Sequence, residues 1–154
     1  TTIDLHGGGD DLIFPHHECE RAQSEAATGE PFVRHWMHVG MVSLGGVKMS
    51  KSLGNLVFVS DLLKEWEPEA VRLAILAHHY RAGFDWIDDI MPAAAARLDR
   101  WRRAGPGGAG MDDVRSRLDD DLDTPGAIAA IDAAVTRGAG VSEAAALLGV
   151  TFAS

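Results

Sequence analysis

The stretch HGGGDDLIFPHHECE, residues 6–20, decides the fold of this chain. Apolar and polar side chains alternate just before it, which predicts a short strand over residues 2–6. We expect the glycines at 7–9 to break this strand, and we expect a helix over residues 15–28 that stops at Gly29. A glycine-rich turn between a strand and a helix is typical of the sheet edge where open α/β folds bind nucleotides and small ligands.

Strand signals continue for a short distance after this stretch. Residues 32–44 are rich in β-branched, aromatic and methionine side chains, which favours a strand. The pair Gly45-Gly46 predicts a turn, and residues 57–59 predict a brief extended piece. The first part of the chain is therefore predicted to be α/β, with a domain over residues 1–59.

Beyond residue 59 the pattern is helical. Pro68 is expected to begin one helix and Asp85 to cap another over residues 86–104. The second of these helices has a buried stripe predicted at Met91, Ala94, Leu98 and Trp101. After the linker AGPGGAG, residues 104–110, we expect helical stretches over 112–122, 125–136 and 142–148. The fold class is thus α/β followed by all-α, with a C-terminal helical domain over residues 60–154.

Composition and charge exclude several classes of function. The chain has 154 residues, a formal net charge of −9 and one cysteine, Cys19. An acidic surface repels phosphates, which disfavours a broad nucleic-acid-binding face. No apolar run approaches the roughly 18 residues that cross a bilayer. A single cysteine excludes an internal disulfide framework and fits a reducing compartment, so we expect a cytoplasmic location without membrane attachment.

Two lysines lie three positions apart in the glycine-flanked segment GGVKMSKSLGN, residues 45–55. Lys48 and Lys51 could place mobile point charges against a polyphosphate and stabilise the negative charge of a leaving pyrophosphate. The flanking glycines would let the loop close over a nucleotide and open again. A solvated turn is the alternative for any two such lysines.

Carboxylates and metal-ligand residues follow the glycine-rich turn. Asp10 and Asp11 could accept hydrogen bonds from ribose hydroxyls or from a substrate ammonium group. His16 and Glu20 are four positions apart and share a helix face, with Cys19 close by. Imidazole, carboxylate and thiolate are all zinc ligands, so this face could hold part of a metal site. A closed tetrahedral site needs more ligands than this helix supplies.

Four segments together resemble the family of cysteinyl-tRNA synthetases and the related mycothiol cysteine ligases. They are, in order, HGGGDDLIFPHHECE, RHWMHVGMV, KMSKSLGN and AHHYR, and the resemblance covers residues 1 to about 135. KMSKS is similar to the second signature of class I aminoacyl-tRNA synthetases. The resemblance implies part of a Rossmann-like catalytic domain and an ATP-dependent ligase that converts L-cysteine to cysteinyl-adenylate. It also implies a zinc ion that selects cysteine by binding its thiolate.

Individual roles follow from the resemblance by position. His16 matches the family's zinc histidine and Glu20 the zinc carboxylate of the tRNA synthetases, with Cys19 left open as an alternative ligand. Gly9 and Asp11 match contacts to the adenylate, and Val42 lies where a backbone contact to adenine is expected. The expected nucleotide contacts are Gly9, Asp10, Asp11, Val42, Lys48, Ser50, Lys51 and Ser52, and the lysines are the expected catalytic residues.

The resemblance leaves two acceptors open. A mycothiol cysteine ligase passes cysteine to the amine of glucosaminyl-inositol, whereas a tRNA synthetase passes it to tRNA. The tail AAALLGVTFAS, residues 144–154, and the acidic charge favour the ligase, while Glu20 follows the tRNA-synthetase pattern. A non-catalytic module that binds a nucleotide or a partner is the third alternative.

The family's nucleotide motif His-Ile-Gly-His and its two zinc cysteines have no counterpart in this sequence. We therefore expect the chain to be the C-terminal half of an enzyme whose N-terminal half is its partner. By itself the chain is predicted not to form the adenylate.

Overall fold

The computed structural model describes residues 2–152, which form two compact units. The strand unit comprises the described residues 2–49 and 80–85, and the helical unit comprises 50–79 and 86–152. Residues 80–85 belong to the strand unit because the Gly40 N–H donates to the Tyr80 carbonyl and the Phe84 N–H to the Met41 carbonyl. Each unit is therefore made of two segments that are separated in the sequence. The domain division at residue 59 remains a prediction.

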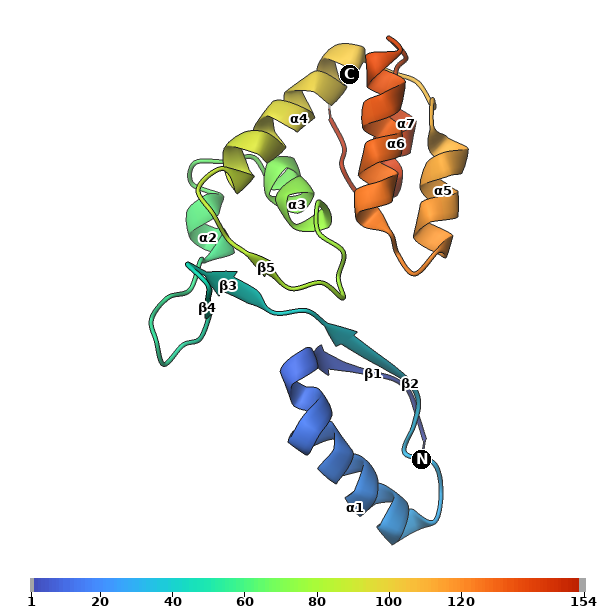
Figure 1. Ribbon diagram of the computed structural model, residues 1–154. Helices are drawn as coiled ribbons and strands as arrows, with labels where there is room; N and C mark the ends of the chain where they lie inside the picture. Colours follow the sequence, from blue (N-terminus) through green and yellow to red (C-terminus); the bar gives the residue numbers. More distant parts are fainter. Residues whose placement is uncertain (1, 153–154) are drawn as a thin grey trace. The chain divides into compact units, whose positions relative to one another are not determined.

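The strand unit contains two small sheets and one long helix (Figure 1). The strand β1 (Ile3–Gly9) pairs in parallel with β2 (Val33–Val39). Between them come a 3₁₀ turn, η1 (Asp10–Leu12), a wider turn, η2 (Ile13–His17), and the helix α1 (Glu18–Thr28). The second sheet has the order β4 (Val47–Lys48), β3 (Val42–Leu44), β5 (Phe84–Asp85). The expected strand–turn–helix order is confirmed.

The glycines do not break β1, contrary to the prediction. The strand continues to Gly9, with Gly8 opposite His38 and Gly9 opposite Val39 in the parallel register. A Cβ at Gly8 would lie 2.9 Å from His17 Cε1 and from Leu12 Cδ1. Glycine is present here because η1 and η2 fold back closely against the strand, and not because the strand ends.

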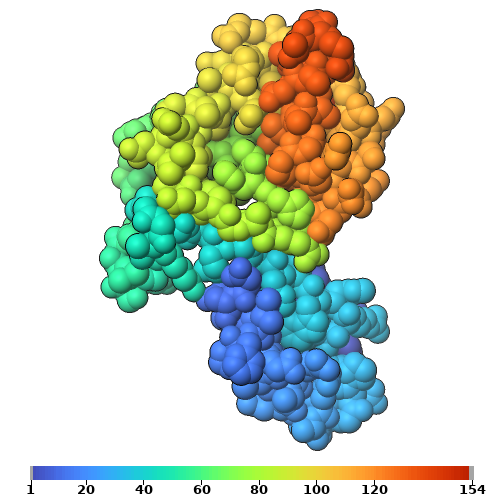
Figure 2. Space-filling view, viewed as in Figure 1, coloured from blue at the N-terminus to red at the C-terminus, as the bar shows by residue number. Residues whose placement is uncertain are grey.

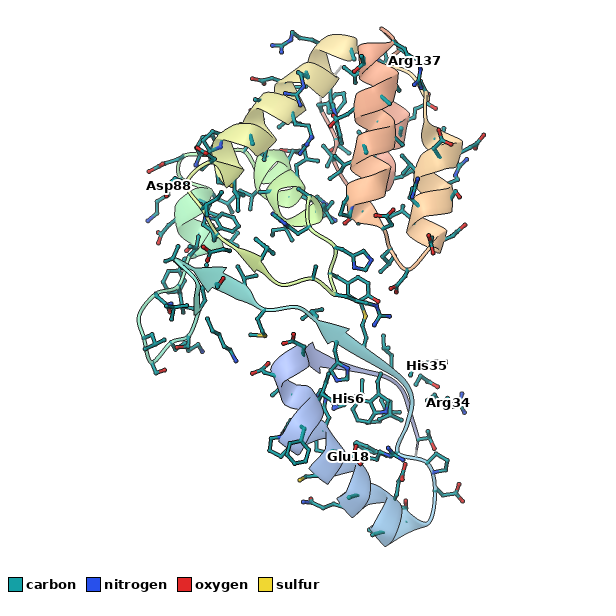
Figure 3. All side chains as sticks on the ribbon, viewed as in Figure 1. His6, Glu18, Arg34, His35, Asp88 and Arg137 are labelled. Carbon is teal, nitrogen blue, oxygen red and sulfur yellow. The ribbon has the colours of Figure 1, made fainter. Side chains whose placement is uncertain are left out.

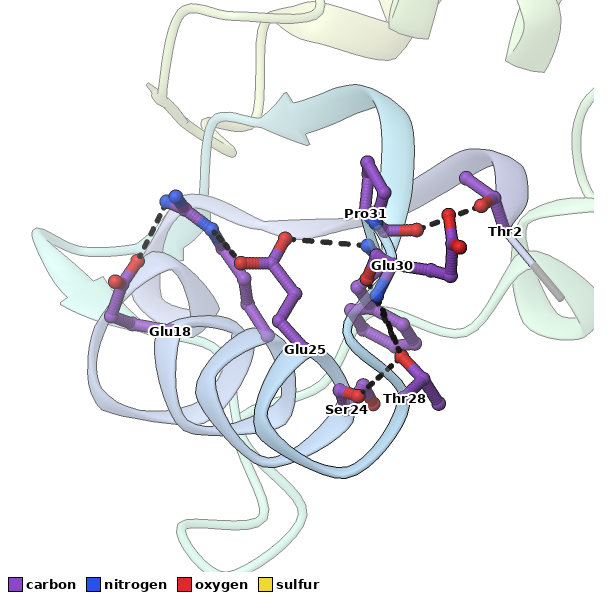
Figure 4. A network of polar contacts seen from close by, with 9 residues as sticks. Thr2, Glu18, Ser24, Glu25, Thr28, Glu30 and Pro31 are labelled. Atoms are coloured by element: carbon purple, nitrogen blue, oxygen red, sulfur yellow. Dashed lines mark hydrogen bonds and ion pairs between the residues drawn. The ribbon is translucent and has the colours of Figure 1, made fainter.

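The helix α1 ends where the sequence predicts. Gly29 adopts a left-handed conformation with φ 69°, and its N–H donates to the Glu25 carbonyl. Figure 4 shows the polar contacts that join this helix end to the following loop. The Thr28 hydroxyl donates to the Ser24 carbonyl, and Glu25 Oε1 accepts from the Phe32 N–H at 3.3 Å. These contacts fix the turn between α1 and β2.

The hairpin between β3 and β4 turns at Gly45 and Gly46, as predicted. Both glycines have positive φ, 61° and 75°, which side-chain-bearing residues rarely adopt. Asp85 does not cap a helix, contrary to the prediction. It lies in β5, where its Oδ1 accepts hydrogen bonds from the Ser43 hydroxyl at 2.8 Å and from the Gly46 N–H at 3.0 Å.

The helical unit contains six helices among its described residues. They are α2 (Val59–Leu62), α3 (Pro68–Leu76), α4 (Ile90–Ala104), α5 (Met111–Asp119), α6 (Thr124–Thr136) and α7 (Ser142–Leu147). Phe58 is extended, as predicted, but Val59 already begins α2, so the predicted extended piece is wrong at its last residue. None of the helices in residues 2–152 combines the length and the apolar character that crossing a bilayer requires.

All the buried apolar side chains found among residues 2–152 belong to the helical unit. The predicted stripe of α4 is confirmed, with Trp101 fully buried and Met91, Ala94 and Leu98 at most 4% exposed. In Figure 2, α4 (yellow) lies against α6 (orange-red). The Trp101 Nε1–H donates to Asp132 Oδ1 of α6 at 2.7 Å, and Arg97 Nε donates to the other oxygen at 3.0 Å. This core therefore includes one satisfied polar link between its helices.

Candidate functional site

The predicted site residues at the carboxyl end of β1 lie close to one another. Gly9 is the last residue of β1, and Asp10 and Asp11 follow in η1. A Cβ at Gly9 would lie 2.5 Å from Asp11 Oδ1 and 3.0 Å from Met41 Sδ. A side chain at position 9 would therefore displace the ends of the Asp11 and Met41 side chains. The carboxyl edge of a parallel strand pair is where α/β folds place ligand-binding groups.

An ion pair joins the first lysine of KMSKS to this strand end. Lys48 Nζ lies 2.5 Å from Asp11 Oδ2, and both side chains are about half exposed. The hydrogen bond from Lys48 lowers the pKa of the Asp11 carboxyl below its ordinary value. The structure therefore brings two predicted nucleotide contacts together within the strand unit.

The two predicted metal ligands also meet. His16 Nε2 lies 3.4 Å from Glu20 Oε1, one helical turn away. Glu20 is engaged on its other side, because its Oε2 lies 3.0 Å from His6 Nε2 of β1. A single carboxylate therefore lies between two imidazoles, one on β1 and one on η2.

Aromatic rings surround His6 on the covered face of the strand pair. His6 packs against Trp36 with ring centroids 5.2 Å apart, and against His17 at 4.8 Å. Figure 3 shows His6 on the side of the strands near α1, whereas Arg34 and His35 point away from it. The rings come from β1, η2 and β2, and together they hold the His6 imidazole in one place.

His17 is the one buried polar side chain among the described residues, at 4% exposed. Its Nδ1 forms a 2.8 Å hydrogen bond with His38 Nε2. Burial lowers the pKa of His17 below its ordinary value, and the neighbouring His6 and His38 lower it further. Burial and the neighbouring imidazoles therefore favour the neutral form of His17.

The second lysine of KMSKS, Lys51, belongs to the helical unit and is exposed in a tight turn. The Ser50 N–H donates to Asn55 Oδ1 at 2.9 Å, and the Ser50 and Ser52 hydroxyls lie 3.1 Å apart. The Gly54 N–H closes the turn onto the Lys51 carbonyl. Hydrogen bonds within residues 50–55 therefore stabilise this loop, and Lys51 lies in the loop and not in a helix or strand.

Val42 is the first residue of β3 and is half-buried. Its carbonyl accepts a hydrogen bond from the Met49 N–H at 3.2 Å. The backbone of β3 therefore already contacts the segment that carries the lysines. A contact between Val42 and an adenine base stays a prediction.

The geometry of His16 and Glu20 fits a shared zinc ion. Two ligand atoms that each lie roughly 2.0–2.1 Å from a tetrahedral zinc are separated by about 3.3–3.4 Å. The measured separation of 3.4 Å between His16 Nε2 and Glu20 Oε1 has this value. Cys19 is exposed, and the group of three possible metal ligands found among residues 2–152 includes Glu20 but neither Cys19 nor His16.

A second group of possible ligands lies beside this pair. His6, His17 and Glu20 each offer one ligand atom, and these atoms lie within 4.8 Å of one another. Sequence reasoning selected Glu20 of this group and missed the part played by His6. No sequence signal marks His6, because its contact with Glu20 depends on the packing of β1 against α1.

A comparison with known protein families identifies the class of protein to which this chain belongs. Residues 1–96 match the family model described as tRNA synthetases class I (C) catalytic domain, and the chain belongs to this family.

Within the family the chain is similar to a group of ligases. It is 52% identical over 160 aligned positions to the L-cysteine:1D-myo-inositol 2-amino-2-deoxy-alpha-D-glucopyranoside ligase of Nocardiopsis dassonvillei, covering 97% of this chain. It is 55% and 56% identical to the ligases of the same name from Parafrankia sp. and Thermobispora bispora, covering 86% and 85% of this chain. The chain spans only 32–39% of the length of these three relatives.

A solved structure supports the fold. The chain is similar to the LeuRS chain in the ternary complex of Agrobacterium radiobacter LeuRS, tRNA and LeuAMS, with a TM-score of 0.66 at 17% identity. The match covers 94% of this chain and 25% of that chain. At this identity the likeness concerns the fold alone.

Proposed function

We propose that this chain is part of an ATP-dependent ligase that activates L-cysteine and transfers it to the amine of glucosaminyl-inositol. The observation that carries the proposal is the juxtaposition of Asp11 and Lys48 at the carboxyl end of β1, in a chain 52–56% identical to ligases of that name. We place this reaction in the cytoplasm, where a protein with a single free cysteine stays reduced.

In the first step, the carboxylate of cysteine attacks the α-phosphorus of ATP and pyrophosphate leaves. Lys48 and Lys51 stabilise the negative charge that develops on the pyrophosphate. Asp11 pairs with Lys48, and a triphosphate would compete with Asp11 for the same ammonium group. In the second step, the acceptor amine attacks the carbonyl carbon of cysteinyl-adenylate, forms the amide and releases AMP.

His16 and Glu20 would hold a zinc ion, completed by ligands outside this chain. When bound, zinc would supply a Lewis acid that prefers the cysteine thiolate over the hydroxyl of serine. The 3.4 Å separation of the two ligand atoms supports this assignment.

The acceptor is tested with the full-length protein. The protein is supplied with cysteine, ATP and either glucosaminyl-inositol or tRNA, and mass spectrometry identifies the product. We expect cysteinylated glucosaminyl-inositol. Cysteinylated tRNA would identify a cysteinyl-tRNA synthetase instead, and absence of both products together with absence of ATP–pyrophosphate exchange would favour a binding module.

A further inference from the structure

We propose that His6 is a positioning residue for the metal pair: it holds one oxygen of the Glu20 carboxylate so that the other oxygen faces His16. This inference rests on the zinc site of the proposed function and assigns a role to a residue outside that pair. His6 and Glu20 are far apart in the chain, on β1 and α1, so their contact depends on the fold of the strand unit.

The two contacts of Glu20 differ, because one is an ion-pair distance compatible with a shared metal ion and the other is a hydrogen bond. His16 Nε2 and Glu20 Oε1 lie 3.4 Å apart, the separation of two atoms that share a tetrahedral zinc. His6 Nε2 and Glu20 Oε2 lie 3.0 Å apart, within the range of an N–H···O hydrogen bond. An ionised carboxylate only accepts hydrogen bonds, so the Nε2–H of His6 donates to Glu20.

The packing around His6 suits a residue that holds another in place. Its ring is fixed by Trp36 at 5.2 Å, by His17 at 4.8 Å and by Phe32 at 5.9 Å between ring centroids. His17 is in turn fixed by its hydrogen bond to His38. A carboxylate on α1 is free to rotate about its own side-chain bonds, whereas a donor clamped by three rings restricts that rotation. Such outer hydrogen bonds orient metal ligands and raise metal affinity.

A competing arrangement uses His6, His17 and Glu20 as the ligands themselves. Their ligand atoms lie within 4.8 Å of one another, whereas a tetrahedral zinc needs each pair of ligand atoms at roughly 3.3–3.4 Å. Metal binding there would also break the hydrogen bond between His6 and Glu20. The geometry therefore favours His6 as the donor to a ligand.

The test measures zinc affinity of the full-length protein by competition with a chromophoric chelator at fixed pH. His6→Ala should weaken zinc binding by about 10–100-fold, the usual effect of losing a hydrogen bond to a metal ligand. His6→Gln, whose amide can donate to Glu20, should recover most of this loss, whereas His6→Met, which fills similar space without a donor, should not. His16→Ala removes a ligand and should weaken binding more than any His6 variant. Circular dichroism of each metal-free variant measures folding separately.

Cobalt substitution supplies a second measurement. The visible absorption of bound Co²⁺ should keep its shape in His6→Gln and change in His16→Ala, because only the second variant alters the ligand set. The inference is overturned if His6→Ala binds zinc as tightly as the parent, or if His6→Met binds zinc as tightly as His6→Gln. It is also overturned if His6→Ala alters the cobalt spectrum in the same way as His16→Ala. Should His16→Ala and Glu20→Ala both bind zinc like the parent, the metal assignment of the proposed function fails instead.

Discussion

Asp132 accepts hydrogen bonds from two side chains of a neighbouring helix. Trp101 is fully buried, so its indole N–H has no access to water if the carboxylate is removed. Asp132→Ala should lower the free energy of unfolding of the 154-residue chain by about 1–3 kcal/mol, the cost of leaving a buried donor without an acceptor. Urea titration followed by tryptophan fluorescence measures this. Asp99→Ala, an exposed aspartate on α4, is the control and should change stability much less; equal effects would contradict the role of Asp132.

Lys51 is the residue on which the proposed first step depends most. In the full-length protein, Lys51→Ala should slow adenylate formation by about 10²-fold or more, as expected for losing one contact to developing charge. ATP–pyrophosphate exchange in the presence of cysteine measures this rate. Lys64→Ala is a matched control, since Lys64 is exposed in the same unit and pairs with Asp61. Unchanged exchange in Lys51→Ala would remove the lysine from the mechanism.

Single residues were predictable from the sequence where a short pattern fixes their neighbours. His16 and Glu20 are four positions apart on a helix, so their proximity follows from local geometry. His6 and Glu20 meet only because β1 and α1 pack together, and no local spacing encodes that contact. The pairing of Asp11 with Lys48 is likewise a consequence of tertiary structure, because 37 positions separate the two residues.

At the scale of elements, Asp85 determines the behaviour of the β3–β4 hairpin toward acid. Hydrogen bonds from the Gly46 N–H and the Ser43 hydroxyl lower the pKa of Asp85 below its ordinary value of 3.8. Stabilisation by a carboxylate with a lowered pKa is present above the ordinary value and is lost as the pH falls through the folded-state pKa. The Gly46 amide resonance should therefore titrate with a midpoint below 3.8.

This titration is followed by NMR of the 154-residue chain, with Asp85→Asn as the control because an amide does not titrate in this range. A midpoint at or above 3.8, or the same transition in Asp85→Asn, would show that Asp85 does not control the hairpin. Ser43→Ala should move the midpoint upward, since one of the two donors to the carboxylate is lost.

Elements with strong periodicity were predicted well, and short elements were not. The buried stripe of α4 repeats at helical spacing, so its position followed from the sequence. By contrast, β5 has two residues and exists because Asp85 and Phe84 pair with β3. The prediction for the glycines of β1 was wrong for a related reason. The sequence alone does not distinguish a glycine that allows close packing of η2 from a glycine that ends a strand.

At the scale of the whole molecule, apolar burial is distributed unevenly between the units. The buried apolar side chains of the described residues all lie in the helical unit, and His17 is the one buried residue found in the strand unit. One face of the β1–β2 pair carries Ile3, Leu5 and Val39, which are 37%, 59% and 40% exposed. Parallel sheets are normally covered on both faces, so this face is incompletely covered in the chain by itself.

The strand unit should therefore open more readily than the helical unit. In hydrogen exchange of the 154-residue chain, amides of β1 and β2 should exchange at least about tenfold faster than amides in α4 and α6, because local opening costs less where few apolar groups are buried. In the full-length protein, the rest of the catalytic domain is expected to cover Ile3 and Leu5 and to slow exchange in β1 and β2. Exchange in α6 is the internal control and should be similar in both proteins. Equal protection of the two units in the 154-residue chain would show that the strand unit is stable without further apolar cover. Unchanged exchange of the β1 amides in the full-length protein would show that nothing packs on this face.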